Sequence, residues 1–287
     1  MNKNKKKEYL GKLGLLVTAM IWGSGFTFSS IALEYFTTFQ IIALRFSIAF
    51  IILMALNAKR LKEIKPTHLF KGSVIGAILF LAYFLQTTGL EFTTTSKNSF
   101  LTAVNVVLVP FISWIIIKKP LSKNTLLGIA FTSFAGSDAS GQLAFNIGDV
   151  ISLVGAIFFG AHIFYTDHYG GKMENSMVMV IQMGVTALLS WIAVLFTGET
   201  QFDFSFEALL PILYIGIIAT LVGYGIQTAS QKHTTSGQSA VILSTEAFFG
   251  MITAILLLNE PVLPTMVIGG ILIFLGILAV ELQPLKE

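Results

Sequence analysis

The chain has 287 residues, of which 54% are hydrophobic and only 11% are charged, and its mean hydropathy is +0.80. So little polar surface excludes a water-soluble globule, and we expect a chain that lies in a lipid bilayer. The net charge of +3 gives no reason to expect nucleic-acid binding, and the absence of cysteine excludes disulfides and thiolate chemistry.

Apolar segments of about 20 residues, the length that a helix needs to cross the hydrocarbon core, recur along the whole chain. The sequence therefore predicts an all-α integral membrane protein with ten transmembrane helices. Their expected ranges are 10–32, 38–57, 69–91, 95–117, 122–139, 149–169, 175–197, 208–231, 236–258 and 263–282.

Lysine and arginine fall almost entirely in one set of alternating loops. With a cytoplasmic N-terminus, sixteen of the 18 cations lie in cytoplasmic segments, as expected because such segments retain Lys and Arg. The basic start NKNKKK is followed by no small-residue cleavage site, so we interpret it as a retained anchor. We expect a multi-pass protein of the inner or plasma membrane with both termini in the cytoplasm.

A polar stretch occurs twice in this apolar sequence. YFLQTTGLEFTTTS at 83–96 returns as YGIQTASQKHTTSG at 224–237, at a constant offset of 141 residues. The same offset pairs Asn105 with Glu246. Apolar composition alone can produce weak similarity by chance, but it does not align Tyr, Gln, Thr, Pro and Gly at one offset.

A second offset of 137 residues relates the segments before this stretch, and it pairs Arg45 with Gln182. We therefore predict two five-helix repeats, at 10–139 and 148–282. Because five is odd, the second repeat enters the membrane from the opposite side, which gives an inverted repeat. Inverted repeats allow the two halves to exchange conformations, so this pattern favours a transporter that works by alternating access.

Two motifs carry a resemblance to a known family, ALRFSIAF at 43–50 and LLLNEPVLPTMVIGGILIFLGILA at 256–279. With the two halves and the short loops, they resemble the EamA-type permeases of the drug/metabolite transporter superfamily over nearly the whole chain. The residues at that family's glutamate-then-glycine signature are Glu260, Pro261, Gly269 and Gly276. In the first half, Lys119 replaces the matching glutamate. The resemblance implies ten helices, cytoplasmic termini and transport of small organic metabolites through a cavity between the halves.

Charged side chains within a span are costly unless they face protein or water, so each is a candidate site residue. Glu246 lies near the middle of 236–258 and is a candidate to bind a substrate ammonium or a coupling proton; the alternative is a structural glutamate bonded between helices. Arg45 is the one arginine within a span, and its planar guanidinium suits a substrate carboxylate or phosphate. Its alternative role is to tie its helix to a neighbour.

His162 also lies within a span, at 149–169, and histidine titrates near neutral pH. It could relay protons together with Glu246, although a histidine hydrogen-bonded within the bundle is the simpler interpretation. Protons are therefore a candidate coupling ion, whereas a facilitated uniporter needs none.

Polar residues follow one face of the span at 95–117, because spacings of four and three residues stack on a helix. Small polar residues also hold helices together in lipid, so packing is an alternative role for Asn98 and Thr102. Asn105 is favoured as a cavity residue, because the repeat pairs it with Glu246. The residues on this face are Asn98, Thr102 and Asn105. We add Trp22 of the first span and the repeated residues Tyr83, Gln86, Tyr224 and Gln227 as candidate substrate-binding residues. The hydroxyls of Thr94 and Thr235 are expected to cap the helices that follow them.

We expect a secondary transporter, an exporter, of small organic metabolites such as amino acids. Its cavity should be bounded mainly by the first, third, fourth, sixth, eighth and ninth spans. The sequence contains no GxxxxGK[ST] loop and no HExxH motif, so we expect no enzyme activity, no cofactor and no metal site. The alternative is a non-transporting scaffold or sensor built on a transporter fold, which the short loops disfavour.

Overall fold

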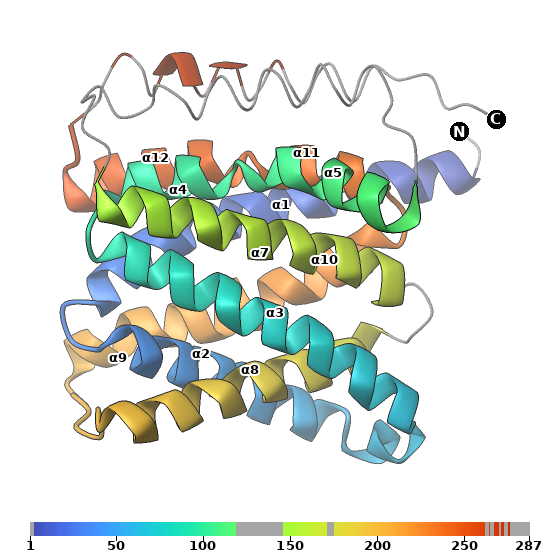
Figure 1. Cartoon of the computed structure of the whole chain (residues 1–287), viewed down its shortest axis with the longest axis horizontal. Helices are drawn as coiled ribbons and strands as arrows, with labels where there is room; N and C mark the ends of the chain where they lie inside the picture. The colour runs from blue at the N-terminus through green and yellow to red at the C-terminus, as the bar shows by residue number, and fades with distance from the viewer. Residues whose placement is uncertain are drawn as a thin grey trace.

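A computed structural model of the chain describes residues 3–118, 146–170 and 175–261, with 264, 267–269, 271–272 and 275 beyond them (Figure 1). Regular secondary structure within these residues is entirely helical. Seven helices of the described part are long and apolar enough to cross a membrane. The predicted span at 122–139 lies outside the described residues, as does most of the one at 263–282.

Where the structure describes them, the connections between helices are short. In chain order they are α1 (Lys3–Ala32), α2 (Thr38–Leu56), the 3₁₀ helix η1 (Ala58–Glu63), α3 (Pro66–Leu90), α4 (Thr95–Thr102), α5 (Asn105–Ile117), α7 (Ile147–Gly170), α8 (Asn175–Thr197), α9 (Phe206–Leu213), the π-helix η2 (Tyr214–Val222), α10 (Gly223–Gln231), α11 (Ser236–Leu243) and α12 (Glu246–Leu258).

The described connections gather at two opposite ends of the bundle, the left and right edges of Figure 1. The lysine-rich end carries the start of α1 with the connections 57–65 and 232–235. The carboxylate-rich end carries 33–37, 91–94 and 198–205, with Glu34, Glu91, Glu199 and Asp203 among its residues. Lys97 is the only described cation at the carboxylate-rich end, and its ammonium pairs with the buried carboxylate of Asp149.

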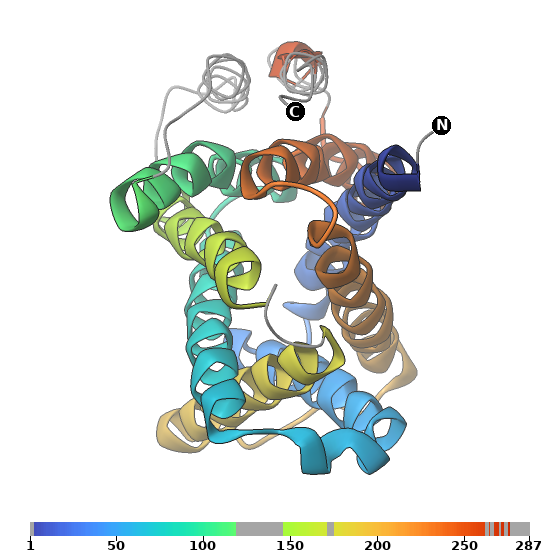
Figure 2. The same ribbon diagram turned by 90° about the vertical axis from the view of Figure 1, so that its right-hand side faces the viewer.

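Figure 2 looks onto the lysine-rich end and shows the helices arranged as a ring, with α7 and α10 bordering its middle. The largest buried apolar cluster joins α2, α3, α7, α8 and α10 through residues that include Phe46, Tyr83, Phe159, Met183 and Tyr224. Large apolar side chains also cover the outside of the bundle, among them Ile51, Leu188, Leu195 and Phe196. An apolar exterior around backbone groups paired within helices is what a lipid environment requires.

Two predicted spans are each divided into two helices. The span at 95–117 consists of α4 and α5, and the span at 236–258 consists of α11 and α12. The interruptions fall at 103–104 and 244–245, which are 141 residues apart, the offset of the sequence repeat. Asn105 and Glu246 therefore each begin a helix, instead of lying inside one as the sequence analysis had it.

Local hydrogen bonds explain the second interruption. The backbone N–H of Thr245 donates to Ile242 O at 3.2 Å, three residues back, so the turn is tighter than in an α-helix. The hydroxyls of Ser244 and Thr245 donate to the carbonyls of Val241 and Ile242 at 2.7 and 2.6 Å. Such side-chain bonds compete with the helical ladder and bend it.

The two hydroxyl-rich links cap helices as expected. The Thr94 hydroxyl accepts from the N–H of Lys97 at the start of α4, and the Thr235 hydroxyl accepts from the N–H of Gln238 at the start of α11, both at 3.2 Å. The first turn of α4 has a further hydrogen-bond partner. The Glu260 carboxylate accepts from the N–H groups of Thr95 and Ser96 at 2.8 and 3.1 Å.

Candidate functional site

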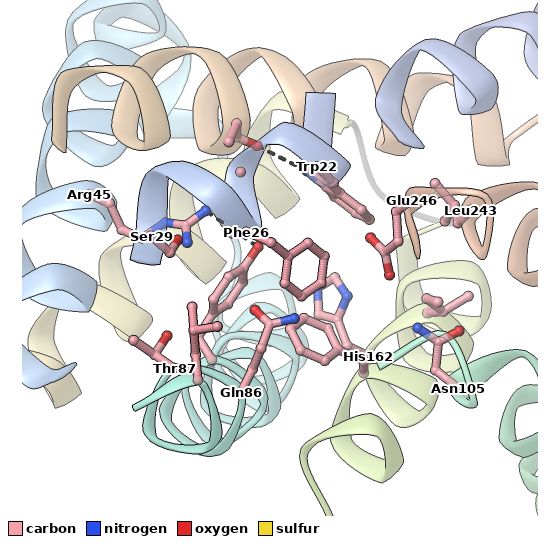
Figure 3. Close-up of a pocket in the computed structure, with 16 residues that line it drawn as sticks. Trp22, Phe26, Ser29, Arg45, Gln86, Thr87, Asn105, His162, Leu243 and Glu246 are labelled. Carbon is pink, nitrogen blue, oxygen red and sulfur yellow. Dashed lines mark hydrogen bonds between the residues drawn. The ribbon is translucent and has the colours of Figure 1, made fainter. Parts of the chain in front are cut away.

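A cavity lined by charged, polar and aromatic side chains lies where the helices of the ring meet, and Figure 3 shows the side chains around it. Its volume is about 30 Å³, which is room for about two water molecules by the same measure. The lining residues come from α1, α2, α3, α5, α7, η2, α11 and α12. They are Trp22, Gly25, Phe26, Ser29, Arg45, Tyr83, Gln86, Thr87, Leu90, Asn105, Phe159, His162, Ile163, Ala219, Leu243 and Glu246.

Arg45 of α2 supplies the positive charge of the cavity, with only 3% of its surface exposed. Its Nε donates to the Thr220 hydroxyl at 2.9 Å, and one terminal nitrogen donates to the Tyr83 hydroxyl at 3.4 Å. Its guanidinium carbon lies 4.2 Å from the centre of the Tyr83 ring, a favourable cation–π contact. No carboxylate of the described residues lies within ion-pair distance of this guanidinium. The guanidinium is therefore held in place by neutral groups and keeps its charge available.

The π-helix η2 shapes the wall beside Arg45. Pro211 has no N–H and precedes the π-helical turns, and the Thr220 hydroxyl donates to Ile215 O, five residues back, at 2.7 Å. The Ala219 carbonyl accepts from Trp22 Nε1 at 2.9 Å. Short π-helical segments inside α-helices occur frequently at functional sites. Here the segment orients Trp22 and Arg45 at the same time.

Tyr83 and Tyr224, the first residues of the two repeated stretches, touch each other. The Tyr224 hydroxyl donates to the Tyr83 hydroxyl at 3.1 Å, and the ring centres lie 6.4 Å apart. This contact joins the two repeated sequence stretches directly beside the cavity.

Glu246 supplies the carboxyl group of the cavity and has 5% of its surface exposed. The described residues offer its carboxylate neither a cation within ion-pair distance nor a hydrogen bond. Glu246 is the first residue of α12. Asn105 begins α5 in the equivalent way, and its Oδ1 has no hydrogen-bond partner among the described residues.

Figure 3 shows Arg45 and Glu246 at opposite sides of the cavity, with Phe26 between them. The two charges do not pair with each other, since no salt bridge joins them. Such an arrangement offers a cationic group and an anionic group to one small molecule, with aromatic rings between them.

His162 of α7 also lines the cavity, but it is hydrogen-bonded within the bundle. Its Nε2 lies 3.0 Å from the Gln182 Oε1, an amide oxygen that can only accept, and 3.5 Å from the Thr166 hydroxyl. Its ring meets the Tyr224 ring edge-on at 5.6 Å. Gln182 of α8, which the sequence repeat pairs with Arg45 of α2, thus orients His162.

The structure brings seven of the eleven predicted site residues to the cavity: Trp22, Arg45, Tyr83, Gln86, Asn105, His162 and Glu246. Asn98 does not line it, because its amide donates to Gln86 O at 3.1 Å and to the Ser152 hydroxyl at 2.8 Å, which joins α4 to α3 and α7. Thr102 is also behind the lining and accepts from Gln86 Nε2 at 3.3 Å. The remaining two, Tyr224 and Gln227, are fully buried on α10.

Ser29, Thr87 and Leu90 also line the cavity, although they were not among the predicted site residues. Helical spacing was the signal that could have found them. Ser29 lies seven residues after Trp22, and Thr87 and Leu90 lie four and seven residues after Tyr83, which places each on the same face as its predecessor. The second span also contributes to the wall through Arg45, beyond the six spans that were expected.

Comparison with known proteins decides the family. The model of the EamA-like transporter family matches residues 9–136 and 146–282. The chain belongs to this family. It is also 33% identical over 277 residues to an uncharacterized transporter of Archaeoglobus fulgidus, covering 96% of this chain and 87% of that one. The uncharacterized transporter YetK of Bacillus subtilis is 23% identical over 278 residues, covering 89% and 82%.

A solved crystal structure shares the fold, with a TM-score of 0.75, 16% identity and 97% coverage of both chains. The EamA-type resemblance seen in the sequence is thus confirmed, and with it membership of the drug/metabolite transporter superfamily. The protein is a multi-pass membrane transporter. Proteins of transporter families generally move solutes without converting them.

Proposed function

We propose that this EamA-family protein is a secondary transporter of small zwitterionic metabolites such as amino acids, and that it exports them by alternating access. The observation that carries the proposal is the pair of unpaired buried charges, Arg45 and Glu246, on opposite sides of one aromatic cavity. An isolated buried charge is unfavourable, and a zwitterion compensates both charges at once.

Each charge has a matching group on the solute. The planar guanidinium of Arg45 suits a carboxylate, to which it can donate two parallel hydrogen bonds. The Glu246 carboxylate accepts from an ammonium, and the rings of Trp22 and Phe26 offer apolar contact to a side chain. Asn105 has a free amide oxygen for a second bond to the ammonium. A highly charged anion such as a nucleotide sugar would meet one cation and one repelling carboxylate.

The cavity of about 30 Å³ is smaller than an amino acid, so binding requires the helices around it to separate. Two oppositely inserted five-helix repeats, at 10–139 and 148–282, would let one half mirror the movement of the other across the bilayer. The helix interruptions 141 residues apart and the contact between Tyr83 and Tyr224 support this arrangement.

We assign the lysine-rich end to the cytoplasm and both termini with it, because cytoplasmic loops retain Lys and Arg. The described cations support this orientation, since they gather at one end of the bundle with the exception of Lys97 and the buried Arg45. Proton coupling would use Glu246, with His162 beside the cavity as the second titratable group.

The test is counterflow in proteoliposomes that contain the purified full-length protein, with protein-free liposomes as control. Phenylalanine is compared with phenethylamine, which lacks the carboxylate, and with 3-phenylpropionate, which lacks the ammonium; leucine and its two analogues form a second series. The proposal predicts exchange of a zwitterion and little exchange of either analogue. Absence of exchange across an amino-acid panel, or preference for the anions, would overturn it. Repeating the assay with a pH gradient decides whether protons are coupled.

A further inference from the structure

Two equivalent helix faces differ in their relation to the cavity. The face of α3 consists of Tyr83, Gln86, Thr87 and Leu90, and all four residues line the cavity. The residues 141 positions later are Tyr224, Gln227, Thr228 and Gln231, which we call the α10 face. They have the same helical spacing, but none of them belongs to the cavity lining, and each is at most 4% exposed.

The α10 face points toward the middle of the bundle and not toward lipid. The Tyr224 hydroxyl bonds Tyr83, and the Tyr224 ring contacts the ring of His162, which are both cavity residues. From this point the α10 face runs toward the lysine-rich end, where Gln231 ends α10. The α3 face runs the other way, because Leu90 ends α3 at the carboxylate-rich end. Figure 2 shows α10 bordering the middle of the ring.

The amides of the α10 face lack partners. Gln227 and Gln231 are buried, yet neither the amide nitrogen nor the amide oxygen of either has a hydrogen-bond partner among the described residues. Each such amide lowers the folding equilibrium constant by about tenfold. Nearly all buried polar groups in proteins are satisfied, so two unsatisfied glutamines one turn apart need an explanation. Gln86, the counterpart of Gln227, faces the cavity and donates to Thr102.

A tight contact closes the bundle beside the α10 face. A Cβ built on Gly14 of α1 would lie only 2.2 Å from the Ser230 hydroxyl, and one on Gly11 would lie 3.0 Å from Ser230 O. Helix α1 therefore packs directly on α10 at the lysine-rich end. Movement of α10 away from α1 would open this contact, which lies next to Gln231 in the sequence of α10.

We propose that the α10 face lines the route from the cavity to the lysine-rich end, and that Gln227 and Gln231 hydrogen-bond water and the passing solute when this route is open. The inference rests on the proposed transport function and deepens it, because it names the residues that would contact the solute between the cavity and the lysine-rich end. The α10 face is more polar than the α3 face, since Gln231 occupies the position of Leu90.

Single cysteines test the proposal without background labelling, because the chain contains no cysteine. Gln231→Cys is treated with the membrane-impermeant reagent MTSET in sealed vesicles of either orientation. His233→Cys and Thr200→Cys, both in exposed connections, report which end faces the reagent. A thiol reacts as the thiolate, which forms only where water reaches it. Gln231→Cys should therefore react about tenfold faster than Ala229→Cys, which is exposed on the outside of the same helix, where we expect lipid.

The reaction should occur from the lysine-rich side only, whereas Leu90→Cys should react from the carboxylate-rich side. Equal rates at Gln231→Cys and Ala229→Cys from both sides would overturn the proposal. Thr228→Cys replaces Gln231→Cys if the latter does not yield monodisperse protein. The outcome is independent of transport: counterflow by the wild type without labelling refutes the route alone, and labelling without counterflow refutes the proposed function alone.

A second variant separates a route from mere packing. Gln227→Leu removes an unsatisfied amide at nearly constant volume, so it should raise the folding equilibrium constant by about tenfold, measured as an increase in Tm. The same change should reduce counterflow by about tenfold, because the route loses its polar wall. Substitution of a purely structural residue would not raise Tm and lower counterflow at the same time. Higher Tm with unchanged counterflow, or a lower Tm, contradicts the proposal.

Discussion

The two divided helices, α4–α5 and α11–α12, have the same pattern of backbone interruption but differ in their side chains. Both are interrupted at equivalent positions, and both begin with a threonine cap. At the start of the second segment, however, Asn105 stands in one copy and Glu246 in the other. The comparison teaches that the repeat conserves helix geometry, while single substitutions at matched positions place the charges that a substrate would meet.

The contacts around these interruptions also differ in tightness. Gly23 of α1 faces the Glu246 turn, where an added Cβ would lie 2.6 Å from Phe249 Cβ and 2.7 Å from Glu246 O. Gly160 of α7 occupies the matching position against α5, where the nearest atom would be Leu108 Cβ at 3.1 Å. The glycine contact beside Glu246 is thus closer than the matching contact beside Asn105.

Substitution of these glycines gives the largest expected effect on stability. Gly23→Ala should destabilise the fold by about 1–3 kcal/mol, because the backbone of α12 must move away. Gly160→Ala needs a shift of only a few tenths of an ångström and gains up to about 1 kcal/mol of helix propensity, so its net effect should be small. Thermal unfolding in detergent measures both. Equal losses of stability would show that the two contacts are equivalent.

Loss of the carboxylate that caps α4 should have an intermediate effect. Glu260→Gln removes the charge that accepts from two N–H groups at the positive end of α4, and should reduce stability by about 1–2 kcal/mol. The matched control is Glu34→Gln at the same end of the bundle, where the side chain is exposed. If both variants unfold at the wild-type temperature, the carboxylate does not stabilise the joint between α12 and α4.

The threonine caps should give the smallest effect and the same one in both halves. Thr94→Ala and Thr235→Ala each remove an oxygen that accepts from a first-turn N–H, so each should reduce stability by about 1 kcal/mol. Serine at either position keeps the acceptor and should restore the wild-type Tm. A loss confined to one of the two alanine variants would mean that the halves do not share this device.

Most long spans followed from hydrophobic length alone, because a helix that crosses lipid needs about 20 apolar residues. The interruptions at 103–104 and 244–245 did not, since serine and threonine hydroxyls bonded to the preceding turn look like ordinary small polar residues in a sequence. The π-helix likewise left no sign in the sequence beyond Pro211.

The site was predictable where a residue was charged and lay within a span. Arg45 and Glu246 stood out for that reason, and both line the cavity. Polarity alone did not distinguish residues that line the cavity from residues that pack between helices. Asn98 and Thr102 bond neighbouring helices, whereas the less conspicuous Ser29 faces the cavity. The difference lies in helix rotation, which only the packing of the bundle fixes.

Counterflow of the best zwitterionic substrate through the Glu246→Gln variant tests the account most directly. The variant keeps the shape of the side chain and removes the charge that we assign to the substrate ammonium, with Glu207→Gln in an exposed turn as the matched control. The account predicts a loss of about 10- to 100-fold in exchange for Glu246→Gln alone, with a Tm at or above the wild-type value and unchanged monodispersity. Exchange at the wild-type rate by a properly folded Glu246→Gln protein would contradict it.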